Sequence, residues 1–226
     1  MPIFAIPFPN IDPVAFAIGP FSVKWYGLAY MAGLLLGWLY IRRLLNQSKL
    51  WAGGAAPFST TKADDLLLYM TIGVVLGGRL GYVLLYQPSH FVANPLEVFA
   101  VWRGGMAFHG ALIGCGLAIW AFAARNGFNP FSSMDLCAAA VPLGLFFGRI
   151  ANFINGELWG RPTTMPWGMV FPGIRDYLNE PTNEPRQSLG WDPLTPRHPS
   201  QLYEAALEGL VLFVVLRVLT HQKEQL

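Results

Sequence analysis

Five apolar segments, each close to the length that crosses a lipid bilayer, constrain this chain more than any other feature. A helix rises about 1.5 Å per residue, so about 20 apolar residues span a hydrocarbon core about 30 Å thick. The segments predict an all-α polytopic membrane protein with about five transmembrane helices. They cover residues 25–41, 66–86, 106–124, 136–154 and 202–219.

The amino-acid composition agrees with a bilayer environment. Hydrophobic residues make up 54% of the chain and charged residues 12%, against about 45–50% and about 25% in soluble domains. The net charge of +2 is too small to suggest a nucleic acid partner. Cys115 and Cys137 both lie in apolar stretches with no second ligand at metal-binding spacing, so we expect reduced, buried thiols and no metal site.

We expect four parts along the chain. Residues 1–22 form an N-terminal interfacial arm, 23–155 carry helices one to four, 156–200 form an extracytoplasmic cap, and 201–226 carry the fifth helix and a cytoplasmic tail. Prolines in the arm exclude one long helix. We therefore expect a short helix and a turn there. The cap holds eight of the eighteen prolines, and we expect a compact unit with short strands or turns.

The orientation follows from the distribution of basic residues. The polar loop between the first two spans carries Arg42, Arg43, Lys49 and Lys62, which predicts a cytoplasmic loop. The N-terminus and the cap then lie outside. Basic residues on that outer side weaken the rule, although most of them belong to the long 157–200 segment, where charge counts less.

Small residues recur every four positions in several spans. This spacing lets helix backbones approach closely in a membrane, so packing explains these glycines without a catalytic role. They are Gly73, Gly77 and Gly81; Gly110 and Gly114; and Gly144 and Gly148.

Arg149 lies near the end of the fourth apolar segment, where an arginine is costly unless it meets an anion or water. At helical spacing, Arg149, Asn152 and Gly156 share one face and Asn155 lies to its side. A guanidinium and an amide beside a glycine could hold a lipid phosphate. Alternatively, Arg149 pairs with Glu157, Glu204 or Glu208 and only locks helices together. The sequence leaves both interpretations open.

Arg79 poses the same question in the second span. It lies among glycines, and either a substrate contact or a buried ion pair with Glu204 or Glu208 would satisfy it. Those two glutamates are four residues apart and therefore share a helix face. We favour a structural or supporting role for Arg79.

His109 and Tyr26 are further candidates with ordinary alternatives. His109 opens the third span after Gly104 and Gly105, and a neutral imidazole can take a proton from a thiol held close to it. A lone histidine near a membrane interface more often only forms hydrogen bonds. For Tyr26, beside Trp25 in the first span, a place in an interfacial aromatic belt is the stronger explanation from position alone.

The last span begins with the motif His198 to Glu204. Pro199 suits the first turn of a helix, but Gln201 and Tyr203 add more polarity than a helix start requires. The signatures of soluble nucleophile and cofactor-binding enzymes are missing from the chain.

Five ordered motifs together resemble the bacterial phosphatidylglycerol:prolipoprotein diacylglyceryl transferase family. Enzymes of this family move the diacylglyceryl group of phosphatidylglycerol to the lipobox cysteine of a prolipoprotein, forming a thioether and releasing glycerol phosphate. The resemblance implies a bacterial inner membrane location with the active site toward the extracytoplasmic side. It also implies phosphatidylglycerol, prolipoprotein signal peptides and membrane lipids as partners, and no cofactor or metal. The motifs cover residues 25–27, 77–82, 104–110, 148–160 and 198–204.

The resemblance also implies roles for individual residues. His109, Arg149 and Tyr26 match the family's catalytic residues, with His109 as the candidate base. The residues that match its substrate-binding and signature positions are Arg149, Asn152, Asn155, Glu157, Gly160, His198 and Tyr203.

One departure from the family pattern concerns the C-terminus. Family members continue beyond the span that ends here near Leu219 into a part with another functionally important arginine, whereas this sequence stops at Leu226. We therefore expect slow transfer or none from this chain. The competing interpretation is a truncated, catalytically impaired membrane protein that binds anionic lipid through Arg149 without turnover.

Overall fold

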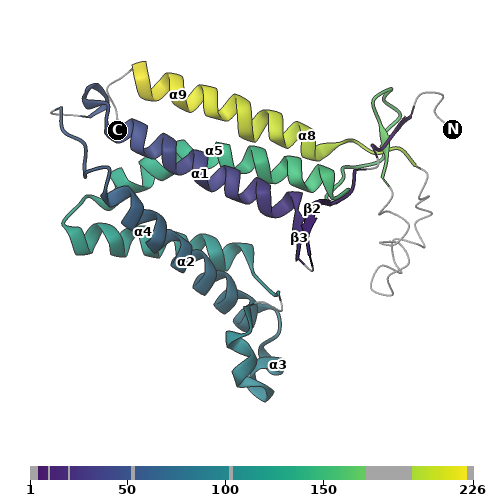
Figure 1. Cartoon of the computed structure of the whole chain (residues 1–226), viewed down its shortest axis with the longest axis horizontal. Helices are drawn as coiled ribbons and strands as arrows, with labels where there is room; N and C mark the ends of the chain where they lie inside the picture. The colour runs from purple at the N-terminus through teal and green to yellow at the C-terminus, as the bar shows by residue number, and fades with distance from the viewer. Residues whose placement is uncertain are drawn as a thin grey trace. The chain divides into compact units, whose positions relative to one another are not determined.

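The structure is a computed structural model that describes residues 5–9, 11–19, 21–51, 54–101, 104–171 and 195–222. It is mostly helical (Figure 1), as the apolar segments predict. Among these described residues, four helices are long and apolar enough to cross a membrane. They are α1 (Trp25–Leu45), α2 (Lys62–Leu85), α4 (Phe108–Asn126) and α5 (Pro130–Ile154).

The fifth predicted span corresponds to three helical elements that follow one another directly. They are α8 (Ser200–Glu204), the π-helical η5 (Ala205–Val211) and α9 (Leu212–Gln222). Pro199 immediately precedes the first of them, where a missing backbone N–H leaves no helical hydrogen bond unmade. A fifth crossing by this run stays a prediction.

The chain divides into two compact units. The first comprises Met1–Gly37 and Val141–Arg217, and the second comprises Trp38–Ala140 and Val218–Leu226.

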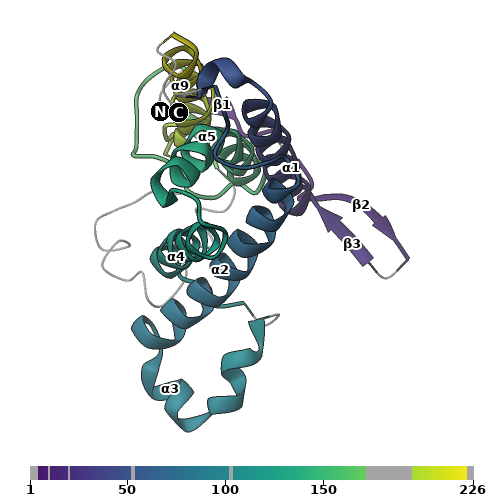
Figure 2. The ribbon, with the colours of Figure 1, turned by 90° about the vertical axis from the view of Figure 1, so that its left-hand side faces the viewer.

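In the second unit, α2 and α4 lie side by side (Figure 2). Glycines of each helix face the other. A Cβ atom added to Gly77 would lie 2.8 Å from the Cα of Gly114, and one added to Gly81 would lie 2.8 Å from the Cα of Gly110. The predicted close packing is therefore confirmed for these two helices. The left-handed Gly127, with φ +72°, then ends α4.

The same unit contains the short helices α3 (Pro88–Ala93), η1 (Ser48–Leu50) and η2 (Pro95–Phe99). At one end of α4, the buried Phe122 packs against the rings of Phe58 and Phe128. Both cysteines are free thiols; Cys137 is buried and Cys115 is half-buried.

In the first unit, α1 and α5 also approach through glycine. A Cβ on Gly33 would lie 3.0 Å from the Cα of Gly144. Side chains on Gly144 and Gly148 themselves would meet no described atom within 4 Å, so packing does not explain Gly148. Gly209 lets η5 approach α5, because a Cβ there would lie 2.7 Å from the Cβ of Phe146.

The N-terminal segment forms strands, so the predicted short helix is wrong for the described residues. Strand β2 (Val14–Ile18) pairs antiparallel with β3 (Phe21–Lys24) through a turn at Gly19 (Figure 2). Strand β1 (Ile6–Pro7) pairs parallel with β4 (Met169–Val170). Prolines remove the N–H donors that a helix interior requires, but a strand edge tolerates them.

An aromatic cluster around Phe171 holds the strand pair β1–β4 against the end of α5. Phe171 is almost fully buried, and Phe8, Phe153, Trp159 and Met169 pack on it. Of the predicted cap, residues 172–194 lie outside the described part of the chain. Its described remainder contains β4 and isolated bridges from Arg197 to Pro162 and Met169.

Candidate functional site

Arg149, in the last two turns of α5, forms ion pairs with two glutamates in the first unit. Its Nε lies 2.8 Å from a carboxylate oxygen of Glu204, and its Nη2 lies 3.6 Å from one of Glu208. The glutamates share a face of the α8–η5 run, which Gly209 brings close to α5. Of the two interpretations left open by the sequence, the ion pair is present.

These ion pairs do not use all of the guanidinium. It carries five N–H donors, and the two contacts involve only Nε and Nη2. The Arg149 side chain is 29% exposed, so further donors can reach an incoming acceptor. With both carboxylates ionised, however, the three side chains sum to one negative charge, which opposes the binding of an anion.

A tight turn follows α5 and fixes the carboxylate of Glu157. Helix α5 ends at Ile154, and Gly156 adopts the left-handed φ of +66° that ends helices. The expectation that Gly156 shares a helix face with Arg149 is therefore wrong. Asn152 and Asn155 donate to the same oxygen of Glu157 over 2.9 and 3.3 Å.

Tyr26 reaches this turn from the beginning of α1. Its hydroxyl forms a hydrogen bond with the Asn152 side chain and is close enough to the Glu157 carboxylate to interact with its charge. The same hydroxyl lies 3.3 Å from that of Tyr30, one turn further along α1. Residues from α1, α5 and the 155–160 turn thus converge around one carboxylate.

Gln201 of α8 also supports the turn and is missing from the predicted site residues. Its side chain is fully buried, and its amide nitrogen donates to the backbone oxygen of Glu157. Its Oε1 has no hydrogen-bond partner among the described residues. The sequence signal was the excess of polar residues at the start of the last span.

A second polar group joins α8 to the preceding loops. The hydroxyl of Tyr203 accepts a hydrogen bond from the indole N–H of Trp167 over 2.7 Å and lies 3.0 Å from Nδ1 of His198. Gly160 donates its N–H to the His198 carbonyl over 2.9 Å, and a Cβ there would collide with that carbonyl and with Ser200.

Arg197 lies next to this group and is buried. Its backbone exchanges two hydrogen bonds with Met169, over 2.8 and 2.9 Å, and its side chain donates to the carbonyl of Gly160 over 3.2 Å. Burial lowers the pKa of the Arg197 guanidinium from its usual value.

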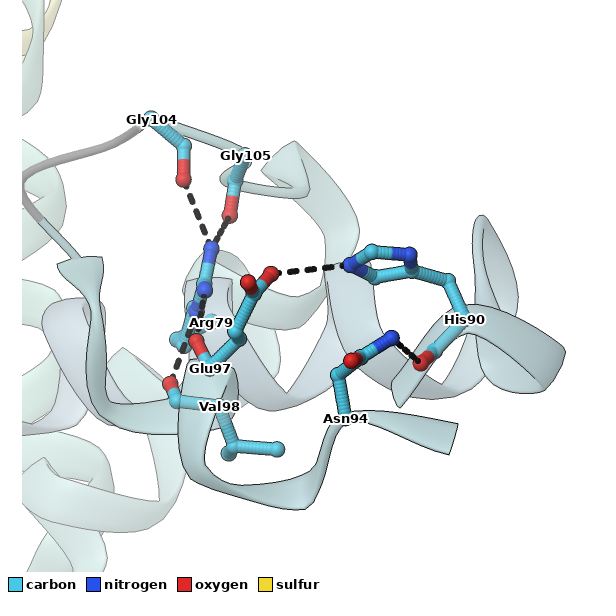
Figure 3. Close-up of polar contacts among 7 residues, drawn as sticks. All are labelled: Arg79, His90, Asn94, Glu97, Val98, Gly104 and Gly105. Atoms are coloured by element: carbon cyan, nitrogen blue, oxygen red, sulfur yellow. Dashed lines mark hydrogen bonds and ion pairs between the residues drawn. The ribbon is translucent and has the colours of Figure 1, made fainter. Parts of the chain in front are cut away.

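The second unit holds the remaining two candidates, His109 and Arg79. His109 is the second residue of α4, is exposed, and contacts the Phe108 ring edge-on at 5.5 Å between centroids. Arg79 donates to the backbone carbonyls of Glu97, Val98, Gly104 and Gly105 (Figure 3). These bonds join parts of the second unit and agree with the structural role favoured for Arg79, while Glu204 and Glu208 pair with Arg149.

Comparison with known proteins gives the family. The family model described as prolipoprotein diacylglyceryl transferase matches residues 13–226. The chain belongs to this family. It is 53% identical over 221 residues, 98% of this chain and 72% of the relative, to the phosphatidylglycerol–prolipoprotein diacylglyceryl transferase of Rhizobium meliloti (strain 1021).

Two further relatives of this transferase family carry the same name. The Phenylobacterium zucineum (strain HLK1) protein is 51% identical over 96% of this chain and 72% of its own length. The Mesorhizobium japonicum protein is 49% identical over 100% of this chain and 73% of its own length. The family is an enzyme family, so the interpretation as a lipid-binding protein without turnover is not favoured.

The first unit of this diacylglyceryl transferase family member brings most of the predicted site residues together. His109 belongs to the second unit. Sequence reasoning missed Gln201 and Trp167 as members of the site. The first-unit residues are Tyr26, Arg149, Asn152, Asn155, Glu157, Gly160, His198 and Tyr203.

Proposed function

We propose that this protein transfers the diacylglyceryl group of phosphatidylglycerol to the lipobox cysteine thiol of a prolipoprotein signal peptide, the first step of lipoprotein maturation. The cysteine sulfur forms a bond to the glyceryl carbon as the bond from that carbon to the phosphate oxygen breaks. The thiol proton goes to a base, and glycerol phosphate leaves with the electron pair. Family membership over residues 13–226 is the observation that carries this proposal.

The reaction takes place at the extracytoplasmic side of the bacterial inner membrane, where lipid and signal peptide meet. Four helices long and apolar enough to cross a bilayer support a multi-pass location. The polar cluster lies at the end of one of them, α5, so it is close to headgroup depth.

Arg149 supplies a donor to the phosphate that leaves. Its Glu204 and Glu208 partners hold the guanidinium in place and leave further N–H groups for a phosphate oxygen. A fixed donor of this kind stabilises negative charge as it develops in the transition state. The partial exposure of the side chain supports this role.

His109 serves as the base that takes the thiol proton, since it is exposed at the beginning of α4. Asn152, Asn155 and Glu157 form a connected group beside Tyr26, and we assign them to the binding of the glycerol headgroup. His198, Tyr203 and Gly160 form the adjoining wall of the same substrate site.

The test uses purified protein, phosphatidylglycerol vesicles and a synthetic signal peptide with a lipobox cysteine. We expect the peptide to gain the mass of one diacylglyceryl group and glycerol phosphate to appear in equal amount. A peptide with serine in place of cysteine and vesicles of phosphatidylcholine are the controls, and neither should react. Absence of product from the cysteine peptide would refute the proposed activity.

The role of Arg149 is tested separately with Arg149→Lys. A lysine ammonium is a point charge and does not reproduce a two-pronged guanidinium contact. We expect kcat/KM to fall about 10²-fold or more, in line with the loss of one preorganised donor. Turnover within a factor of two of the unsubstituted protein would remove Arg149 from the phosphate contact.

A further inference from the structure

Arg79 is a buried cation whose hydrogen bonds go to backbone carbonyls. It lies near the end of α2 and is 6% exposed. The guanidinium donates to Val98 over 2.8 Å and to Gly104 and Gly105 over 2.6 and 3.2 Å. A further bond to the Glu97 carbonyl brings the total to four (Figure 3).

These four acceptors belong to two separate stretches of the segment that joins α2 to α4. Glu97 and Val98 lie in the helical turn η2, while Gly104 and Gly105 come just before α4 (Figure 3). One planar guanidinium therefore ties the two stretches to α2. Phe91 of α3 closes the site, with its ring centroid 5.1 Å from the Arg79 guanidinium carbon.

The stretch 104–107 is fixed to α2 by further contacts. The N–H of Ala107 donates to the carbonyl of Gly78 over 2.9 Å. Gly104 and Gly105 have φ values of +83° and +78°, and a Cβ on Gly105 would lie 2.5 Å from the Tyr82 ring and 3.0 Å from Nη1 of Arg79. The backbone conformation favours glycine at both positions, and lack of space also requires it at Gly105.

His109 comes two residues after Ala107, in the first turn of α4. A histidine that acts as a base must keep its ring within hydrogen-bond reach of the thiol. The direction of its side chain depends on where α4 begins, and that start is set by residues 104–107.

Arg79 is poorly suited to bind a phosphate, because it already donates four hydrogen bonds to carbonyls.

We propose that Arg79 is a positioning residue for His109: it holds the two glycines before α4 and thereby sets the place of the imidazole. The inference rests on the proposed function of His109 as the base. Arg79 itself touches neither substrate nor the reacting atoms.

The test is Arg79→Lys in the full chain. An ammonium group offers three donors at one point and cannot span two stretches of backbone as a guanidinium does. We expect kcat to fall at least tenfold while the KM for phosphatidylglycerol stays within threefold. Arg125→Lys, at an exposed arginine in the last turn of α4, is the matched control and should leave both constants within twofold.

Two measurements report on position without relying on turnover. Hydrogen exchange of the backbone amides of residues 104–110 should accelerate at least tenfold in Arg79→Lys, while residues 112–122 stay protected and show that α4 remains folded. The rate at which diethyl pyrocarbonate modifies His109 should change at least threefold. His221, also in the second unit, provides the reference rate.

The outcomes separate the two proposals. A kcat within twofold of the unsubstituted protein, or unchanged exchange and modification, would overturn the positioning role. A raised KM with unchanged kcat would overturn it in favour of a lipid contact. If the unsubstituted protein transfers nothing, the proposed function fails, and altered exchange and His109 modification would still support the control of His109 by Arg79.

Discussion

At the scale of single residues, the turn after α5 contains a non-glycine residue with positive φ, the only one among the described residues. Leu158 has a φ of +57°, a region that non-glycine residues enter at a cost of about 1–2 kcal/mol. The residue is 58% exposed, so burial does not compensate for this cost. The hydrogen bonds of Glu157 on one side and Gly160 on the other hold the strained residue between them.

Leu158→Gly should therefore be more stable than Leu158→Ala, because both remove the side chain but only glycine relieves the backbone. We expect the free energy of unfolding to differ by about 1 kcal/mol in favour of glycine. Denaturation of the two variants in detergent measures this difference directly. Equal stability would mean that the left-handed conformation is not strained.

At the scale of elements, the α2–α4 pair depends on glycines that face the neighbouring helix. Gly114 and Gly116 lie two residues apart in α4 and differ in surroundings. A Cβ on Gly114 would meet the backbone of Gly73 and Gly77, whereas one on Gly116 would meet nothing within 4 Å. The two positions form a natural matched pair.

Gly114→Ala should separate the helices and lower the free energy of unfolding by about 1–3 kcal/mol, the usual effect of overpacking. Gly116→Ala should be neutral or stabilising by up to about 1 kcal/mol, because alanine favours the helix. Unfolding of both variants in the same detergent gives the comparison. A loss of stability in both would show that contact with α2 does not decide the effect, since helix propensity alone favours alanine at either position.

The contact between α5 and the α8–η5 run carries a second prediction. If Arg149 meets a lipid phosphate, its two glutamate partners repel that anion. Glu208→Gln should therefore tighten binding of phosphatidylglycerol several-fold, since Glu208 is the more distant and more exposed partner. Equilibrium binding to vesicles measures the effect.

The matched variant is Glu204→Gln, at the closer partner. It should lower stability more, because it removes the shorter ion pair. If neither variant changes lipid affinity, Arg149 acts only as a lock between helices, the alternative that the sequence left open.

At the scale of the whole molecule, the predicted roles divide between the two compact units. The group around Arg149 lies in the first unit, and His109 lies in the second. Binding of lipid and removal of the thiol proton should then be separable by mutation.

His109→Gln should keep phosphatidylglycerol affinity within about twofold and lose most transfer, because an amide is polar but offers no basic nitrogen. Vesicle binding and peptide modification, measured on the same preparation, test both parts. Normal turnover, or joint loss of binding and transfer, would exclude His109 as the base.

The sequence predicted the helices well because length and hydrophobicity alone determine what can cross a bilayer. It also predicted close helix packing, because the spacing of the glycines can be read directly from the sequence, but it did not say that α2 and α4 are the helices that meet. The N-terminal strands escaped prediction because prolines exclude a helix without specifying β1, whose partner β4 lies about 160 residues away.

Most residues of the candidate site could be predicted from the sequence, but the partners that their side chains contact could not. Arg79 binds carbonyls, which every residue possesses, so no side-chain pattern indicates them. Gly156 was assigned to a helix face by spacing, whereas its own freedom to adopt positive φ ends the helix before it.

The pairing of β1 with β4 imposes a parity rule on the chain. Two strands can share hydrogen bonds only on the same side of a bilayer, so the chain between them must cross an even number of times. Four helices of spanning length lie between Pro7 and Met169, which satisfies the rule. During synthesis the β1–β4 pair cannot form before residue 170 has been made, and by then the chain of all four helices has been synthesised.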